Sequence, residues 1–392
     1  MRVSRHRWLA CLLTLLGLAL LGLWAPVQAC VLCVNLGDPF TIEIERARLV
    51  VFGSVASSRL NPNAVDGTSE FLIEAVIKDD GTLKERKTIP INRYVPANPK
   101  IKFMIFVDVV DGAYDVYRSL VFSTDRVVNY LKNLPPRGKA ETDETMAARL
   151  RYLFDFLNDA EPEVAADAYK EFATSSNRSV ALAAPSFSAD KLRTWLTDPK
   201  TDPARLSLYG YLLGACGDPA RDVALLKGCV LRPDERMSNA IDGLLAGLIQ
   251  LNPAEGWRVA QDVVTTSEMS FVRKRGVLTT MTFLYSAHGA AVKPQVLALS
   301  GLMLKQADIM DLVMEHLRRW QLWDHTDVIL GLYGTPAAAA PMTQRNIVRY
   351  ALSCGATAHH AKAAAFIAEL RRTRPDFVKD VEEGLRLEAL PR

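Results

Sequence analysis

Apolar and polar residues alternate along the chain from Leu49 to Phe122. The alternating runs are LVVFGSV, SEFLIEAVI, KTIPINRYV, IKFMIFVDVV and YDVYRSLVF, and the segments between them carry turn residues. A period of two predicts half-buried β-strands, and Asp111-Gly112 predicts a hairpin because a type I′ turn needs positive φ at both central residues. We therefore expect about five antiparallel strands that form a small barrel or sandwich. The segment DPFTIEIERA before them fits both a helix and a strand.

The pattern changes after Phe122. Ser123 to Leu131 predicts a short helix, residues 133–145 (NLPPRGKAETDET) predict a polar linker, and apolar residues then recur at spacings of three and four. About fourteen such segments follow, and several begin with Asp-Pro or Asn-Pro. A capping residue followed by proline is typical of a helix N-terminus. The second part of the chain is therefore predicted to be entirely helical.

Pairs of these predicted helices recur at roughly 35–45 residues, which is the period of stacked helical repeats. In such an array each helical hairpin buries its apolar face against its neighbours. We predict an α+β multidomain protein in which a small antiparallel β-barrel or sandwich precedes an all-α, HEAT-like helical-repeat array. The predicted domains are an export signal (1–29), a β-domain with a short helix at its end (30–134), a linker (135–145) and the repeat domain (146–392).

One segment carries a resemblance to a known repeat family. AEPEVAADAYKEFA, with Pro162, Val164, Ala165 and Ala168, resembles the second helix of a HEAT-type repeat, and SFVRKRGVLTTMTFL and TQRNIVRYALSC are similar to it. The resemblance covers residues 142–387 and is degenerate. It implies a scaffold that offers an extended surface, and it brings no catalytic residues with it.

The N-terminus has the layout of a bacterial export signal. Three arginines precede an apolar run from Trp8 to Trp24, and Pro26 and Ala29 lie just before Cys30. Basic, apolar and small-residue regions in this order predict cleavage and export to the periplasm or cell envelope. A retained anchor is the alternative, because the run approaches the roughly 17 residues that can span a bilayer.

The charge balance gives no sign of a polyanionic partner. The chain has 47 Lys and Arg and 44 Asp and Glu, and removal of residues 1–29 takes three arginines and no acidic residue. The mature chain is then formally neutral, and the short run KERK at Lys84–Lys87 predicts a solvated turn. A nucleic-acid partner is therefore not expected, whereas a protein partner is.

Cys30 and Cys33 form a C-x-x-C pair directly after the predicted cleavage region. Val34 stands where c-type haem attachment needs a histidine, which excludes that use. A thioredoxin-like pair needs a preceding buried strand and a helix N-terminus, and this position lacks the strand. Structural zinc needs four ligands, and the other candidates, Cys216 and Cys229, are far away in the sequence.

Two main interpretations of this pair remain. Val27-Gln28-Ala29-Cys30 resembles a bacterial lipoprotein signal, which implies a lipid on Cys30. Ordinary cleavage would instead leave Cys30 and Cys33 as a disulfide in an oxidising compartment. Membrane attachment would come from a lipid on Cys30 or from an uncleaved signal. Cys216 and Cys229 are predicted on neighbouring helices, where a disulfide and two buried thiols both fit.

The β-domain also carries a resemblance. An exported domain that begins at or beside a cysteine and continues as five strands is similar to netrin-like modules, the OB-type barrels of tissue inhibitors of metalloproteinases. In those inhibitors a Cys-x-Cys opens the mature chain, and the first cysteine binds the zinc of the target. Here the spacing is C-x-x-C, and no cysteine follows within the predicted strands. The resemblance therefore implies the barrel more than the inhibition.

Few residues suggest catalysis. His316 and His325 flank a junction with Trp320 and Trp323, which predicts either a polar, aromatic-lined pocket or surface histidines beside core tryptophans. The sequence has no G-x-S-x-G, G-x-x-x-x-G-K-[ST] or G-x-G-x-x-G motif. No catalytic residue, metal ligand or cofactor is predicted.

These patterns together predict an exported, non-enzymatic scaffold of the cell envelope that binds a protein partner through a helical-repeat surface. Two alternatives from other classes remain. One is a thiol-disulfide protein that uses Cys30 and Cys33, and the other is a protease inhibitor that acts through a free N-terminal Cys30.

Overall fold

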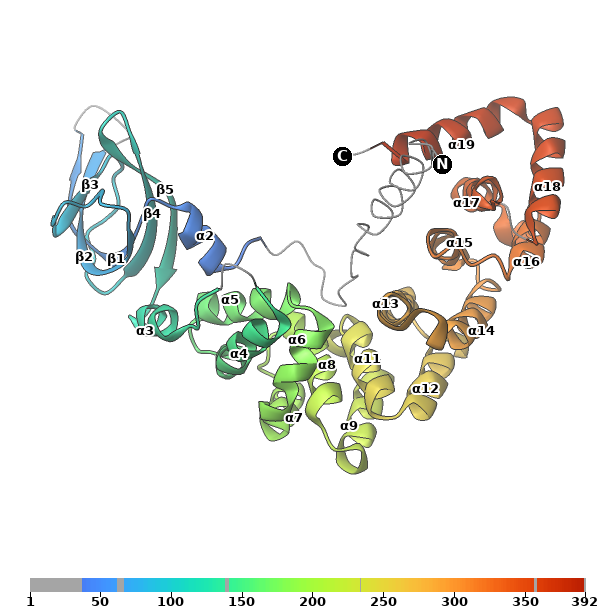
Figure 1. Cartoon of the computed structure of the whole chain (residues 1–392), viewed down its shortest axis with the longest axis horizontal. Helices are drawn as coiled ribbons and strands as arrows, with labels where there is room; N and C mark the ends of the chain where they lie inside the picture. Colours follow the sequence, from blue (N-terminus) through green and yellow to red (C-terminus); the bar gives the residue numbers. More distant parts are fainter. Residues whose placement is uncertain (1–36, 62–66, 138–140, 233, 356–357, 391–392) are drawn as a thin grey trace, which may run out of the picture.

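The structure is a computed structural model that describes residues 37–61, 67–137, 141–232, 234–355 and 358–390. An antiparallel sheet lies at the N-terminal end of these residues, and helices make up the rest (Figure 1). The predicted order, a β-domain before an all-helical region, is confirmed.

The described part of the β-domain holds one helix and five strands. They are α2 (Phe40–Arg46), β1 (Leu49–Leu60), β2 (Gly67–Asp79), β3 (Thr88–Ile91), β4 (Lys102–Val110) and β5 (Ala113–Phe122). All neighbours are antiparallel, in the order β3-β2-β1-β4-β5. Asp111 and Gly112 both adopt positive φ, as the predicted β4–β5 hairpin requires. The ambiguous segment DPFTIEIERA forms α2, with Pro39 at its N-cap.

The sheet curves but does not close, which corrects the prediction of a barrel. Within the described residues, β3 and β5 are both edge strands. β3 has only four residues, and its Pro90 lacks the N–H that pairing with a further strand would use. The domain is therefore an open, strongly curved sheet.

Irregularities in β1 produce the curvature. The pairing of β1 with β2 shifts register at three places along β1, and such bulges bend a strand and increase its twist. A Cβ atom on Gly53 would collide with the carbonyl oxygen of Leu72. Only glycine therefore allows β1 and β2 to approach this closely at the bend.

Both faces of the curved sheet carry a layer of apolar side chains. The inner face forms its own core, which includes Leu49, Val51, Phe71, Ile89 and Ile105. The outer face packs against Phe40 of α2 and continues into the core of the helical region, through Val50, Phe52, Met104, Phe106 and Tyr130. The two parts of the molecule therefore share one continuous hydrophobic core.

The helical region consists of successive short helices. They are α3 (Arg126–Asn133), α4 (Asp143–Leu153), α5 (Pro162–Ala173), α6 (Asn177–Ala183), α7 (Ala189–Thr197), α8 (Leu206–Cys216), α9 (Pro219–Leu231), α10 (Glu235–Ser238), α11 (Ile241–Leu251), α12 (Pro253–Thr265), α13 (Phe271–His288), α14 (Lys293–Met303), α15 (Met310–Arg319), α16 (Thr326–Gly331), α17 (Pro341–Ser353), α18 (His360–Thr373) and α19 (Pro375–Glu388). The side chains of the predicted caps Asp202, Asp218 and Asn252 each accept a hydrogen bond from a backbone N–H in the first turn of the helix or 3₁₀ turn that follows.

Contacts between the helices recur at a nearly constant sequence separation. Side-chain hydrogen bonds join Tyr211 to Asn177, Asp242 to Ser207, His316 to Thr282, Glu315 to Arg349 and Asp380 to Arg345, and their separations are all 34 or 35 residues. A constant separation means that each helix contacts its counterpart one unit further along the chain. These contacts therefore indicate repeating units of about 35 residues, close to the lower end of the predicted period.

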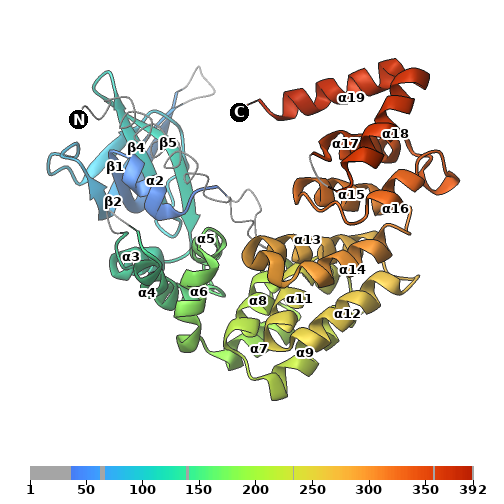
Figure 2. The same cartoon turned by 45° about the vertical axis from the view of Figure 1, so that its right-hand side comes forward.

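The stacked units form a curved array with the β-domain at one end (Figures 1 and 2). Helices α11, α13, α15 and α17 follow its inner side, and α12, α14, α16 and α18 follow its outer side. The last helix, α19, lies across α17 and α18. We call the surface over α11, α13, α15 and α17 the inner face.

Glycines bring α8 and α11 unusually close together. Gly210 and Gly214 lie one turn apart on α8, and Gly243 and Gly247 lie one turn apart on α11. A Cβ atom at any of these positions would collide with backbone atoms of the facing helix. This contact lies in the middle of the array, and both helices are almost entirely buried there.

Candidate functional site

Asp167 connects the β-domain to the helical array. Its carboxylate accepts hydrogen bonds from the backbone N–H of Phe40 and from the hydroxyl of Tyr130, each at 2.6 Å. The two donors belong to α2 and α3, whereas Asp167 lies on α5. Asp167 is only 1% exposed to solvent. We call this group, with Glu171 described below, the joint.

Burial raises the pKa of Asp167 to about 6, against the two hydrogen bonds, which lower it. A carboxyl whose pKa is raised by folding binds its proton more tightly in the folded state. Its contribution to stability is therefore complete below its ordinary pKa of 3.8 and is lost as the pH rises through about 6.

The Asp167→Asn variant is expected to lose this pH dependence. Asparagine can still accept from Phe40, and the Tyr130 hydroxyl can turn to accept from the new amide. The free energy of unfolding of the wild type, relative to the variant, should rise by about 1 kcal/mol between pH 7 and pH 5. Urea unfolding at a series of pH values measures this difference. If the free energy of unfolding depends on pH in the same way for both proteins, this prediction is wrong.

Glu171 occupies the same joint one turn further along α5. Its carboxylate accepts hydrogen bonds from Arg149 at 2.6 Å, from Arg137 at 2.9 Å and from the hydroxyl of Thr41 at 2.9 Å. Glu171 is fully buried and Arg149 is 1% exposed, and Arg149 also donates to the carbonyl of Pro135. Residues of the predicted linker are therefore fixed in the joint, and the β-domain is held in one orientation on the array.

Charged side chains join the last inner helices. Glu315 on α15 accepts hydrogen bonds from Arg318 and from Arg349 of α17, and both arginines also donate to Glu388 of α19. Burial would raise the pKa of Glu315, but the two arginines lower it to about 2. Its contribution to stability is therefore present above the ordinary pKa of 4.5 and is lost as the pH falls towards 2.

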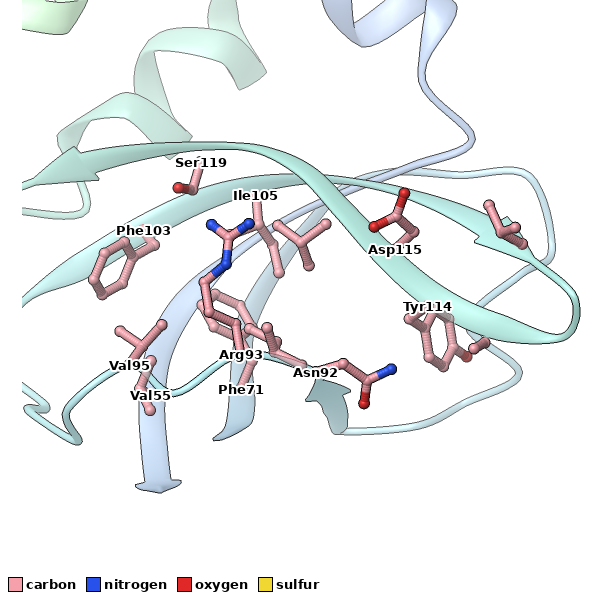
Figure 3. Close-up of a pocket in the computed structure, with 14 residues that line it drawn as sticks. Val55, Phe71, Asn92, Arg93, Val95, Phe103, Ile105, Tyr114, Asp115 and Ser119 are labelled. Atoms are coloured by element: carbon pink, nitrogen blue, oxygen red, sulfur yellow. The ribbon is translucent and has the colours of Figure 1, made fainter. Parts of the chain in front are cut away.

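A cavity of about 280 Å³ lies inside the curved sheet, at the gap between β3 and β5 (Figure 3). Its wall is largely apolar and includes Phe71, Phe103, Ile105 and other core side chains. Polar groups surround it at the gap, namely Asn92, Arg93, Tyr114, Asp115 and Ser119. The cavity exists because the sheet does not close, so the inner core is left incomplete at this edge.

The predicted cysteine sites are only partly visible. Cys30 and Cys33 lie outside the described residues. In the structure Cys216 and Cys229 are not joined by a disulfide. Burial raises the pKa of Cys216 to about 11 and also raises that of Cys229. Both thiols are therefore protonated at neutral pH, and a disulfide between them stays a prediction.

The two histidines at the tryptophan junction are held by neighbouring helices. His316 packs on the Trp320 ring, and its Nδ1 lies 3.2 Å from the hydroxyl of Thr282. Burial lowers the pKa of His316 to about 4. Nε2 of His325 lies 2.9 Å from the carbonyl of Leu297. These contacts are those of core side chains between repeats, and neither histidine lines the cavity inside the sheet.

Sequence inspection missed both acidic residues of the joint and the cavity. Asp167 and Glu171 lie within AEPEVAADAYKEFA, the segment that resembles a HEAT-type helix. Both fall on the same side as the buried Val164 and Ala168, at helical spacing, which marks them as buried acidic residues in need of partners. No local signal indicated the partners, because Phe40 is 127 residues away from Asp167.

The described residues hold neither a cluster of metal ligands nor a helix of membrane-spanning character. They contain no group of three or more His, Cys, Asp or Glu side chains arranged to hold a metal ion. They also contain no helix that is long and apolar enough to cross a membrane.

Comparison with known proteins leaves the family open. No protein-family model matches the sequence, and no curated protein is significantly similar to it. A solved structure of human deoxyhypusine hydroxylase in complex with glycerol is 18% identical over 66% of this chain and 93% of its own, with a TM-score of 0.25. A TM-score this low does not support any inference from that protein to this one.

Proposed function

We propose that this protein is an exported, non-enzymatic scaffold of the cell envelope that binds a protein partner on the inner face of its helical array. The observation that carries the proposal is the continuous core, which runs from Phe40 in the β-domain to Tyr350 in α17. A surface that is held in one shape loses little conformational entropy on binding. Stacked helical arrays use such extended curved surfaces to bind partners.

The charges on the array favour a protein over a polyanion. Arg318, Arg349 and Arg345 on the inner helices are each paired with a carboxylate, from Glu315, Glu388 or Asp380. Paired charges of both signs provide hydrogen bonds and specificity, and they do not produce the positive field that attracts nucleic acid. The C-terminal part of the inner face is therefore suited to a partner of mixed charge.

We also propose that the array is a degenerate HEAT-type array and that the β-domain is an open relative of netrin-like, OB-type barrels. The stacking of α11, α13, α15 and α17 on the inner side and of α12, α14, α16 and α18 on the outer side supports the first assignment, and the contact separation of 34 or 35 residues is shorter than the roughly 40–47 of typical HEAT repeats. Five strands in a strongly curved, partly open sheet support the second.

Site-specific photo-cross-linking in cells tests the inner face. A photoreactive phenylalanine would replace Arg275, which is exposed on inner helix α13, and in a matched control Arg372, which is exposed on outer helix α18. A discrete adduct from position 275 and none from position 372 is expected. Equal adducts from both positions, or none from position 275, would contradict a binding role for this face.

The export proposal predicts the mass of the mature chain. Cleavage after Ala29 should remove residues 1–29, so that the mature protein begins at Cys30. Intact-mass analysis of protein from the cell envelope distinguishes three states of Cys30, which are a lipid, a disulfide with Cys33 and a free amine. A mass that still includes residues 1–29 would overturn cleavage and favour the retained anchor.

A further inference from the structure

The loop between β2 and β3 is held in one shape by hydrogen bonds to Asp79 and by the burial of Leu83. A carboxylate oxygen of Asp79 accepts hydrogen bonds from the backbone N–H groups of Gly81–Leu83, and the Leu83 side chain is buried in the inner core. Lys84 and Glu85 both adopt positive φ, which residues other than glycine seldom do. The KERK run is exposed, as predicted, but it belongs to a fixed loop that presents its cations in a set direction.

Two of these cations, Lys84 and Arg86, line a second cavity of about 400 Å³ between the loop and the β4–β5 hairpin. Arg48, Lys84 and Arg86 contribute to its wall, and none of its lining residues is acidic. Within the described residues, these three side chains form no ion pair. Three unpaired cations around a single hollow make a site for an anion. We call it the basic cavity.

The basic cavity adjoins the apolar cavity inside the sheet. Asn92, Ala113 and Tyr114 line both of them. Tyr114 forms the partition, because its hydroxyl donates to the carbonyl of Thr82 in the loop at 3.1 Å and its ring lies 5.8 Å from the guanidinium of Arg86. Figure 3 shows Tyr114 at the end of the gap beside β5. An apolar hollow therefore opens next to a cationic one.

We propose that the β-domain binds an anionic amphiphile, with its apolar part in the cavity inside the sheet and its phosphate or carboxylate in the basic cavity. At about 280 Å³ the apolar cavity lies just below the usual size of small-molecule pockets, so it suits a short alkyl chain or one aromatic ring. The anion would complete the pairing of Arg48, Lys84 and Arg86. The incomplete inner core and the unpaired cations are thus satisfied by one ligand.

Arg93 and Asp115 do not provide an equivalent anion site. Both line the apolar cavity at the gap, where they carry opposite charges. The field of one offsets that of the other, so this side of the cavity does not select an anion. The head group is therefore assigned to the basic cavity.

Isothermal titration of the mature chain with three probes tests the proposal. The probes are octyl phosphate below its micelle concentration, inorganic phosphate, and octyl glucoside, which has the same chain and no charge. Octyl phosphate should bind saturably and at least about tenfold more tightly than either of the others, because only it fills both cavities. Equal affinity for octyl phosphate and octyl glucoside, or no saturable binding of octyl phosphate, would overturn the proposal.

Matched variants locate the head group. Lys84→Gln removes a cation from the basic cavity, and Lys87→Gln removes one from the same loop at a position that does not line it. Loss of one charge-assisted hydrogen bond should weaken octyl phosphate binding about tenfold in Lys84→Gln and less than about twofold in Lys87→Gln. Equal losses would mean attraction by net charge alone and would overturn the site.

A third variant locates the apolar part. Val116 lines the apolar cavity and does not line the basic cavity. The larger ring in Val116→Phe should therefore fill the apolar cavity. It should weaken both octyl probes and leave the affinity for inorganic phosphate unchanged, and a melting curve like that of the wild type checks the fold. Unchanged binding of octyl phosphate would overturn this placement.

Vesicles distinguish the source of the ligand. If the natural ligand is a membrane lipid, the protein should sediment with phosphatidylglycerol vesicles, not with phosphatidylcholine vesicles, and Lys84→Gln should reduce sedimentation. If octyl phosphate binds but the protein sediments with neither kind of vesicle, the ligand is a soluble amphiphile. Both results support the shared chemistry. Sedimentation with both vesicles alike, together with no binding of octyl phosphate, contradicts it.

Discussion

Replacement of Gly247 by alanine is expected to lower the free energy of unfolding by about 3 kcal/mol or more. A Cβ atom there would collide with the carbonyl oxygen of Gly210, which is backbone and cannot turn aside. The helices α8 and α11 would have to separate along a contact that is buried on both sides. Urea unfolding followed by circular dichroism measures the loss.

Gly228 provides the matched control. It lies inside α9, and a Cβ atom there would meet nothing within 4 Å. Gly228→Ala should therefore stabilise the protein by about 0.5–1 kcal/mol, because alanine loses less backbone entropy in a helix than glycine. Replacement of glycine by alanine is thus expected to destabilise the protein at position 247 and to stabilise it at position 228. A loss below about 1 kcal/mol in Gly247→Ala would show that the close contact of α8 with α11 is wrong.

Glu171→Leu is expected to destabilise the protein by about 3–5 kcal/mol. The substitution leaves the buried guanidinium of Arg149 with the carbonyl of Pro135 and without a carboxylate partner. It also removes the α5 partner of Arg137 and of Thr41, so that α2 and the linker each lose a hydrogen bond to α5. Limited proteolysis should then cut between α3 and α4 sooner than in the wild type.

An exposed ion pair gives the comparison. Lys191 donates to Asp155 at 2.7 Å, and the two side chains are 49% and 65% exposed to solvent. Asp155→Asn should change the free energy of unfolding by no more than about 1 kcal/mol, because water screens the exposed pair. If Glu171→Leu costs as little as Asp155→Asn and leaves proteolysis unchanged, the joint does not fix the β-domain on the array.

Local patterns predicted most of the secondary structure. Alternation marked the five strands, although β1 and β4 bury side chains on both faces, and Asp-Pro and Asn-Pro caps marked helix starts that the structure contains. Where two patterns competed, as in DPFTIEIERA, periodicity could not decide. Burial of Phe40 against the outer face of the sheet gave the helix.

The candidate sites were far less predictable. Arg48, Lys84 and Arg86 lie up to 38 residues apart, and the sequence presents them as separate charges among acidic neighbours. Their meeting depends on the β2–β3 loop and on the β4–β5 hairpin, which come together only because the sheet curves. The close contact between α8 and α11 could not be predicted either, because a glycine in a predicted helix does not indicate which helix packs against it.

The sequence alone determined the order of the elements, their type and the units of the array, because alternation, helical spacing and capping act over a few residues. The tertiary structure decided that the sheet stays open, that Asp167 and Glu171 become the joint, and that an apolar and a basic cavity share Tyr114. These features depend on contacts between residues from about 20 to more than 120 positions apart. Such contacts form only when the shared core fixes the β-domain on the array, and no short stretch of sequence encodes that arrangement.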